Sequence, residues 1–321
     1  MTKMMDGLLG LAIGDALGVP VEFVDRNYLK INKVTDMEGY GSHKVPKGTW
    51  SDDTSMTIAT LDSINEKKSV DYEDIMKKFA EWYCDSKYTA TGLFFDIGIS
   101  TRKSIEKYLH GISPLQCGGD KEFENGNGSL MRIFPIVCYC IDMNFDDETS
   151  TKIINEASSL THAHNISKMA CKMYYDIVKG LMNSESLVEV VRQLKKEQYL
   201  EYYDLASVNK FDRILSGNIF SCDEQDISSS GYVVNSLEAA LWCLIKTRSY
   251  KEAVIKAVNL GDDTDTVAAI TGSLAGVLYG IDDIPKQWIN DLINVDYLIN
   301  LSNSYEKLIN SKSEDIGGKR I

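Results

Sequence analysis

The segment MMDGLLGLAIGDALG, residues 4–18, carries the clearest indication of how this chain folds. Its apolar residues recur with helical periodicity, and four glycines follow at intervals of three and four, which places them along one side of a helix: Gly7, Gly10, Gly14 and Gly18. Each glycine costs about 0.8–1 kcal/mol relative to alanine in a helix interior, so something must offset them. Two explanations are open. Either the helix packs closely against another helix, or it must approach a functional site, with Asp15 and Glu22 near its C-terminal end.

The same periodicity recurs through most of the chain, whereas strand-like alternation is scarce and only 5 of the 321 residues are proline. The nearest approach to a strand is the short run 232–234. Helical stretches are visible at residues 56–64, 72–82, 153–160, 169–182, 237–245, 253–260, 267–278 and 288–299. We therefore predict an all-α protein. Because no Ser/Pro-rich linker or charge block divides it, we expect a single domain over residues 1–310 and a polar C-terminal tail over 311–321.

The charge balance bears on the kind of partner. The chain has 34 basic and 47 acidic residues and a net charge of −13, whereas nucleic-acid binding depends on clustered Lys and Arg. A local basic patch would have to act against the field of the whole protein. The composition, with 44% hydrophobic and 25% charged residues, is that of a soluble globular protein. The sequence thus argues against a nucleic-acid partner.

Cysteine usage and targeting signals bear on location. The seven cysteines include no Cys-x-x-Cys pair, and they are typical of reduced thiols in a cytosol. The N-terminus lacks the pattern of a signal peptide, and we find no run of about 18 apolar residues. We therefore expect a cytoplasmic protein, monomeric, that is neither secreted nor inserted in a membrane.

The strongest chemical signal is an acidic motif that occurs twice, each time directly before a helical stretch: SDDT at residues 51–54 and DDTDT at residues 262–266. Asp, Ser and Thr are ordinary helix N-caps, so capping is the simplest explanation. A cap needs only one oxygen acceptor, however, and several carboxylates within one turn repel one another unless a cation or protons intervene. With the hydroxyls of Ser51 and Thr266 they form an all-oxygen donor set, which hard divalent ions select. We therefore predict a metal cluster assembled from two distant helix starts.

A third motif is the run GNGSLMR, residues 126–132, which precedes an apolar stretch. Small residues expose backbone N–H groups at which phosphates bind, and Arg132 could add a charge-assisted contact. The alternative is an ordinary turn, because the spacing matches neither a P-loop nor a dinucleotide motif. His162 and His164 are two residues apart, the wrong interval for two ligands on one helical face. His162 is therefore either a contact to a base or phosphate or a packed, neutral side chain.

Taken in order along the chain, these motifs closely resemble those of the ADP-ribosylglycohydrolase family. The stretches that carry the resemblance are GDALGVPVE (14–22), GTWSDDT (48–54), GNGSLMR (126–132), LTH (160–162) and GDDTDT (261–266), and they extend over nearly the whole chain. The resemblance implies a compact orthogonal multi-helix bundle with two divalent cations, Mg²⁺ or Mn²⁺, in a cleft. It also implies hydrolysis of the glycosidic C1″ bond of an ADP-ribosylated substrate.

The resemblance extends to individual residues. The metal ligands that it implies are Ser51, Asp52, Asp53, Asp263, Asp265 and Thr266. Glu22 matches an acidic residue that in some members contacts the metal site and gates substrate entry, while Asp262 stands where many members have Gly. The candidate catalytic residues are Glu22, Glu124 and Asp53. The candidate substrate-binding residues are Gly126, Asn127, Gly128, Ser129, Arg132, His162 and, as the ring that stacks on adenine, Tyr232.

Three functions are consistent with this resemblance. The leading expectation is release of ADP-ribose from a protein side chain through an arginine-type N-linkage. The second is hydrolysis of small ADP-ribose conjugates or related nucleotides, because the motifs do not describe the loops that would face the leaving group. The third is a non-catalytic relative that binds ADP-ribose or serves structurally. Loss of metal ligands would mark such a relative, and none is lost here.

Overall fold

The computed structural model describes residues 3–317, most of which are helical. Strand pairing within this part of the chain is limited to isolated bridges, so the all-α prediction is confirmed. The α-helices are α1 (Met4–Gly18), α2 (Arg26–Ile31), α3 (Asp52–Lys67), α4 (Tyr72–Asp85), α5 (Ile99–Leu109), α6 (Phe134–Asp142), α7 (Asp147–Ser159), α8 (Asn165–Met182), α9 (Leu187–Gln193), α10 (Lys196–Leu200), α11 (Leu205–Asn209), α12 (Asp212–Leu215), α13 (Val233–Ile245), α14 (Tyr250–Val258), α15 (Thr264–Tyr279), α16 (Lys286–Asp291) and α17 (Val295–Gly317). Short 3₁₀ turns connect several of them.

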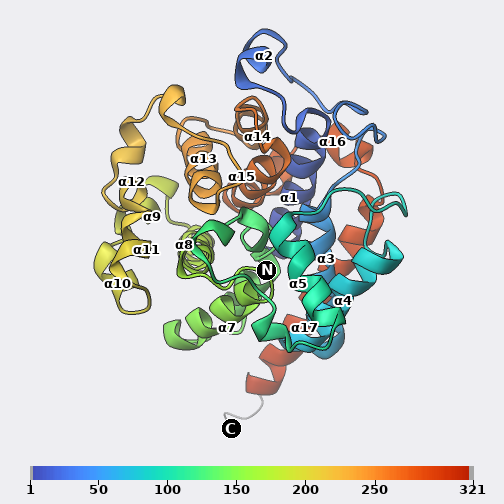
Figure 1. Ribbon diagram of the computed structural model, residues 1–321, viewed down its shortest axis with the longest axis vertical. Helices are drawn as coiled ribbons and strands as arrows, with labels where there is room; N and C mark the ends of the chain where they lie inside the picture. Colours follow the sequence, from blue (N-terminus) through green and yellow to red (C-terminus); the bar gives the residue numbers. More distant parts are fainter. Residues whose placement is uncertain (1–2, 318–321) are drawn as a thin grey trace.

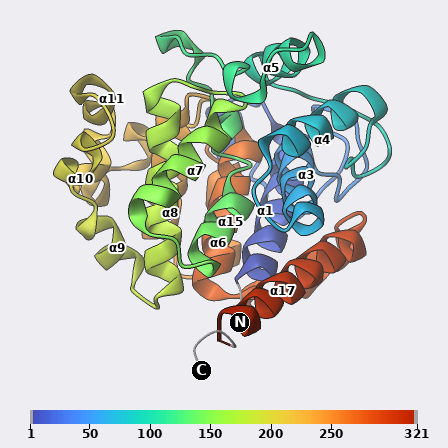
Figure 2. The same cartoon turned by 90° about the horizontal axis from the view of Figure 1, so that it is seen from below.

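Helices α1 and α15 form the centre of the molecule and share its most extensive helix–helix contact. In both views α8 lies on the α15 side of this pair, as α13 does in Figure 1, whereas α3 and α4 lie on the α1 side (Figures 1 and 2). The helices pack as one body around this pair, as the single-domain prediction requires.

The glycines of α1 allow this contact. A Cβ atom on Gly10 or Gly14 would lie 2.2 or 2.1 Å from the carbonyl oxygen of Gly272 or Ala268 in α15, so no side chain fits between the two backbones. A Cβ atom on Gly18 would lie 2.3 Å from the Cα atom of Asp265. Both explanations for the four glycines therefore hold. The glycines allow α1 to pack closely against α15, and this packing places the end of α1 next to the second acidic motif.

Residues 233–234, part of a run too short to predict a strand, begin α13. Two local expectations differ from the structure. The stretch 288–299 is split between α16 and α17, because the backbone turns extended at Leu292 and left-handed at Asn294. Residues 311–317 of the expected tail belong to α17, whose buried Leu308 and Ile309 lie on the side that packs toward the core. Residues 318–321 lie outside the described part of the chain.

The expectation about apolar segments also needs correction. By length and composition alone, Met4–Val21 could cross a membrane, with a mean hydropathy of 1.4. In the folded protein 83% of it is buried, because α1 is the central helix. All seven cysteines are unpaired, as expected, and five of them are buried.

Candidate active site

The two acidic motifs meet at the centre of the fold, at the N-terminal ends of α3 and α15. Asp53 connects them: its Oδ2 atom accepts hydrogen bonds from Ser51 Oγ and from Thr266 Oγ1, each at 3.2 Å. Ser51 is the N-cap of α3, whereas Asp263, at the N-cap position of α15, makes no capping hydrogen bond with its side chain. Capping therefore explains Ser51 but not the carboxylates that follow it.

Asp15 of α1 fixes the start of α3. Its fully buried carboxylate accepts hydrogen bonds from the backbone N–H groups of Ser51 and Thr54 and from Thr54 Oγ1 at 2.6 Å. Burial raises the pKa of Asp15 to about 6, while these hydrogen bonds oppose the shift. The side chain thus orients the first turn of α3, and with it the ligand candidates of that turn.

The carboxylates of the two motifs crowd one another away from water. Burial, followed by repulsion between like charges, raises the pKa of Asp52, Asp53 and Asp265 well above the ordinary value. Asp53 is 1% exposed, and its Oδ1 atom has no hydrogen-bond partner among the described residues. An unpartnered buried carboxylate oxygen is costly unless it binds a cation.

A divalent cation fits this arrangement of oxygen atoms. Glu22 approaches the cluster from the turn after α1, and one carboxylate oxygen each from Glu22, Asp263 and Asp265 lie within 4.8 Å of one another. Carboxylates with hydroxyls of Ser and Thr are the donors that hard divalent ions prefer. The residues present therefore suit the group that the acidic motifs indicated.

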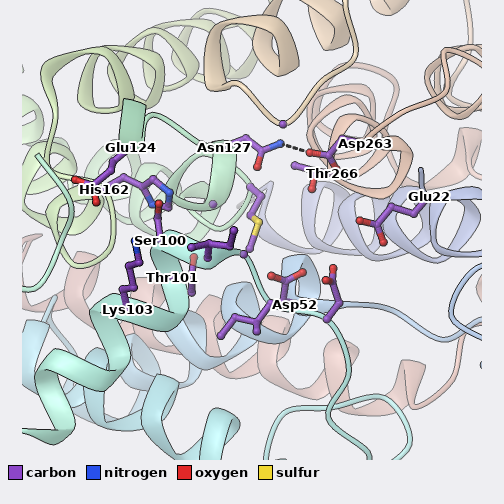
Figure 3. Close-up of a pocket in the computed structure, with 18 of the residues that line it drawn as sticks. Glu22, Asp52, Ser100, Thr101, Lys103, Glu124, Asn127, His162, Asp263 and Thr266 are labelled. Carbon is purple, nitrogen blue, oxygen red and sulfur yellow. Dashed lines mark hydrogen bonds between the residues drawn. The ribbon is translucent and has the colours of Figure 1, made fainter. Parts of the chain in front are cut away.

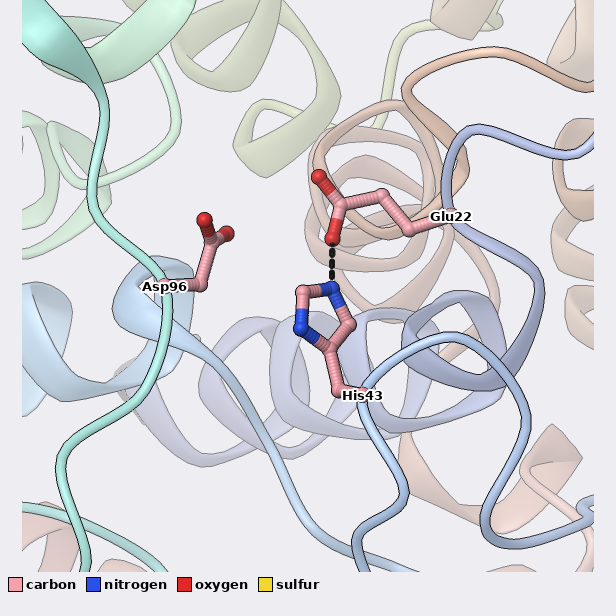
Figure 4. A group of neighbouring side chains, drawn as sticks. All are labelled: Glu22, His43 and Asp96. Atoms are coloured by element: carbon pink, nitrogen blue, oxygen red, sulfur yellow. Dashed lines mark hydrogen bonds and ion pairs between the residues drawn. The ribbon is translucent and has the colours of Figure 1, made fainter.

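Two further residues join this group that the sequence analysis did not identify, His43 and Asp96 (Figure 4). His43 Nε2 contacts Glu22 Oε2, and ligand atoms of Glu22, His43 and Asp96 also lie within 4.8 Å of one another. Burial raises the pKa of Glu22 to about 7, and the hydrogen bond to Glu22 raises the pKa of His43. The one available signal for Asp96 was its position as a lone acid in the apolar run 93–97.

The acidic cluster opens into a cleft of about 580 Å³ (Figure 3). Asp52, Glu22 and Asp263 lie at one end of it, while His162 and Glu124 lie at the other. The walls between them come from the start of α5 and from the 126–128 turn.

The turn is tied directly to the acidic cluster. Asn127 Nδ2 donates to Asp263 Oδ2 at 2.7 Å, and the backbone N–H of Asn127 donates to Gly231 O. Gly126 and Gly128 lie against His162, whose ring carbon would be 2.9 Å from a Cβ atom on Gly128. Burial, with Arg132 nearby, lowers the pKa of His162 to about 3, so the imidazole is neutral. His162 is thus a packed, neutral side chain that also lines the cleft, and its contact with a base or phosphate stays a prediction.

Several candidate substrate residues do not reach the cleft. The prediction that Arg132 binds diphosphate is wrong, because its fully buried guanidinium donates to Ala157 O and Thr161 Oγ1 and lies 4.9 Å from the ring centre of Phe79. Ser129 is also fully buried, with its hydroxyl bonded to that of Ser158.

The other end of the cleft also differs from expectation. Tyr232 is half-buried at the start of α13 and does not line the cleft, whereas Phe123, 80% exposed, does. Glu124 lines the cleft at the end away from the acidic cluster (Figure 3). Asp53 lies beneath the cleft lining, which favours a ligand role over direct proton transfer. Asp262 is exposed, and within residues 3–317 its hydrogen bonds are made by the backbone, with Phe23, Val24 and Thr264.

Comparisons with known proteins bear on the family of this chain. The sequence model of the ADP-ribosylglycohydrolase family matches residues 1–315. An ADP-ribosylarginine hydrolase, Tri1, from Serratia proteamaculans is 34% identical over 307 residues, which cover 94% of this chain and 78% of that protein. The ADP-ribosyl-[dinitrogen reductase] glycohydrolase of Rhodospirillum rubrum is 28% identical over 90% of both chains. A solved structure titled ADP-ribosylglycohydrolase-related protein complex superposes with a TM-score of 0.78 at 26% identity, covering 96% of this chain and 98% of the other.

Proposed function

The chain belongs to the ADP-ribosylglycohydrolase family, and we propose that it hydrolyses the C1″ bond between ADP-ribose and an arginine side chain of a protein. The observation that carries the arginine assignment is Asp96, a carboxylate that lines the acidic end of the cleft and belongs to neither acidic motif. A guanidinium group is cationic and pairs with carboxylates through several parallel hydrogen bonds. A hydroxyl leaving group such as that of serine gains no comparable stabilisation there. Similarity to an arginine hydrolase supports the same choice.

We assign the metal ligands to the acidic cluster. Two divalent cations, Mg²⁺ or Mn²⁺, would be held by Ser51, Asp52, Asp53, Asp263, Asp265, Thr266 and Glu22. When bound, such ions supply Lewis-acid polarisation of ribose hydroxyls and of a water near C1″. Asp15 and Asn127 keep the ligands of α3 and α15 in register through their hydrogen bonds.

The rest of the cleft is suited to the nucleotide portion of the substrate. The exposed backbone of the 126–128 turn can donate to diphosphate oxygens, and the neutral His162 beside it offers a ring nitrogen without adding charge. Phe123 provides an exposed aromatic face at this end, on which adenine can stack. This end is separated from the acidic end by the length of the cleft (Figure 3), as an ADP-ribose with its ribose at the acidic cluster requires.

Glu22 is the group best suited to proton transfer. Its carboxyl lines the cleft beside the acidic cluster, where a ribose held at the cluster would present its C1″ bond. The departing guanidine must gain a proton as the C1″ bond breaks, and the attacking water must lose one. Glu124, at the far end of the cleft, is too distant from this chemistry to share it, so we assign it to the nucleotide end.

The test is release of ADP-ribose from arginine-linked, serine-linked and small-molecule conjugates, each with Mn²⁺, with Mg²⁺ and with chelator. We expect metal-dependent release that is fastest from the arginine-linked protein, and loss of at least 100-fold in kcat for Asp53→Asn. Asp262→Asn is the matched control, because this exposed carboxylate belongs to the same motif but not to the cluster. Absence of turnover on every substrate, or unchanged turnover in Asp53→Asn, would refute the proposal.

The arginine assignment has its own test. Asp96→Asn keeps the size of the side chain but removes the charge that faces the guanidinium, so it should slow the arginine-linked substrate at least 10-fold more than the serine-linked one. An equal loss on both linkages would mean that Asp96 does not select the leaving group.

A further inference from the structure

A turn outside the family motifs grips the segment that carries Glu22. Ser42 donates twice to this segment, from its backbone N–H to Pro20 O at 2.9 Å and from Oγ to Glu22 O at 2.7 Å. The adjacent His43 contacts the Glu22 carboxylate through Nε2. Both the backbone and the side chain of Glu22 are therefore held by two consecutive residues.

The backbone of this turn lies close to Pro20. Gly41 has φ of +54°, and a Cβ atom there would lie 1.8 Å from Pro20 O, so only glycine fits. Tyr40 and Val45 close the turn, with Tyr40 N–H donating to Val45 O at 2.6 Å. The His43 imidazole thus extends from a turn that is closed by a backbone hydrogen bond.

His43 also lies close to the carboxylate of Asp96. Its ring lies against that of Phe95, with centroids 5.3 Å apart, and Phe95 directly precedes Asp96. Figure 4 shows the imidazole below the space that separates the carboxylates of Glu22 and Asp96. Glu22 and Asp96 come from loops more than 70 positions apart in the sequence, and the imidazole ring lies next to both side chains.

We infer that His43 is a positioning residue for the proposed reaction: carried on the Gly41–His43 turn, it holds Glu22 turned into the cleft and sets the separation of Glu22 from Asp96. A free glutamate side chain has three rotatable bonds and would sample positions away from the cluster. Small displacements of a reacting group lower the rate steeply, so a fixed carboxylate matters more for turnover than for folding. The inference rests on the proposed function, because it assigns His43 a role in that same site.

The experiment compares His43→Ala with His43→Gln, whose amide can still donate to Glu22. The readouts are the Kd of Mn²⁺ for metal-free protein by calorimetry, the kcat and KM on the arginine-linked substrate, and Tm. We expect His43→Ala to lose 10- to 100-fold in kcat and to bind Mn²⁺ more weakly at unchanged Tm, with most of both restored in His43→Gln. His110→Ala, an exposed histidine at the end of α5, is the control and should match the wild type.

A second variant tests the turn without touching the imidazole. Gly41→Ala must displace the turn from Pro20, so it should reproduce the kinetic loss of His43→Ala. The inference is overturned if His43→Ala keeps wild-type kcat and Mn²⁺ affinity, or if His43→Gln is as impaired as His43→Ala, since the hydrogen bond to Glu22 would then not be what positions that side chain. Failure of the wild type to hydrolyse any substrate would refute the proposed function, while the Mn²⁺ titrations would still report on the hold of His43 on Glu22.

Discussion

Removal of divalent cations should make the stability of this protein fall as pH rises from about 4 to about 7. Burial raises the pKa of Asp15 from 3.8 to about 6 and that of Glu22 from 4.5 to about 7, and it raises those of Asp52, Asp53, Asp263 and Asp265 as well. A carboxyl whose pKa is higher in the folded state favours folding below its unfolded value, near pH 4. That contribution disappears as pH rises through the folded pKa, here between about 6 and 7.

The size of the effect follows from the two shifts that have values. Each is two pKa units or slightly more, and one unit corresponds to ~1.4 kcal/mol, so either group accounts for ~3 kcal/mol. Because the carboxylates interact, their contributions are not added, and we take ~3 kcal/mol as the total. For 321 residues with an unfolding entropy of ~2.1 cal/mol/K each, this corresponds to a decrease in Tm of ~4 °C.

Thermal unfolding followed by circular dichroism at pH 4, 5, 6 and 7 measures this, once in chelator and once in excess Mn²⁺. Metal binding requires deprotonated carboxylates, so the difference in Tm between the two series should widen with pH. Glu22→Gln removes one of the titrating groups and should flatten the chelator series. A Tm that stays level or rises with pH in chelator would refute the reasoning, as would an unchanged slope in Glu22→Gln.

Three further predictions concern single residues. Gly14→Ala should lower the free energy of unfolding by ~3 kcal/mol or more in a urea titration, because its Cβ would meet Ala268 O at 2.1 Å; Gly98→Ala, whose Cβ finds its nearest atom at 3.8 Å, should change stability by less than ~1 kcal/mol. Arg132→Met should change Tm but leave KM for the ADP-ribosyl substrate unaltered, and a several-fold rise in KM would restore the diphosphate assignment. Asp53→Asn should weaken Mn²⁺ binding at least 10-fold by calorimetry, and retention of wild-type affinity would exclude it as a ligand.

Much of the fold could be read from local pattern. The glycine stripe of α1 indicated a helix with one closely packed side, and the structure shows that side against α15. Helix boundaries near 292–294 and beyond 310 were not predictable in the same way. A break at Asn294 depends on a left-handed backbone conformation, and extension of α17 depends on the surface against which its apolar face packs.

Some residues of the candidate site could be predicted from the sequence, and others could not. A motif with several oxygen donors, such as the one around Asp53, can be recognised in the sequence. Adjacent carboxylates repel one another, so the motif predicts a bound cation. Arg132 belonged to a suggestive motif, yet its direction depends on the turn into α6, which sends the side chain toward Phe79. His43 had no local signal, since its importance arises only from contact with Glu22.

The sequence by itself determined the helical class, the central glycine-lined helix and the chemistry of the two acidic motifs, because each depends on residues within one or two helical turns. The tertiary structure alone decided which side chains face the cleft. Asp96 lines it together with Glu22, His43 contacts Glu22 from outside the lining, and Arg132 and Tyr232 do not line it. These outcomes depend on loops that come together from distant parts of the chain. The direction of a loop side chain is set by the surfaces against which it packs, and local sequence periodicity does not predict those contacts.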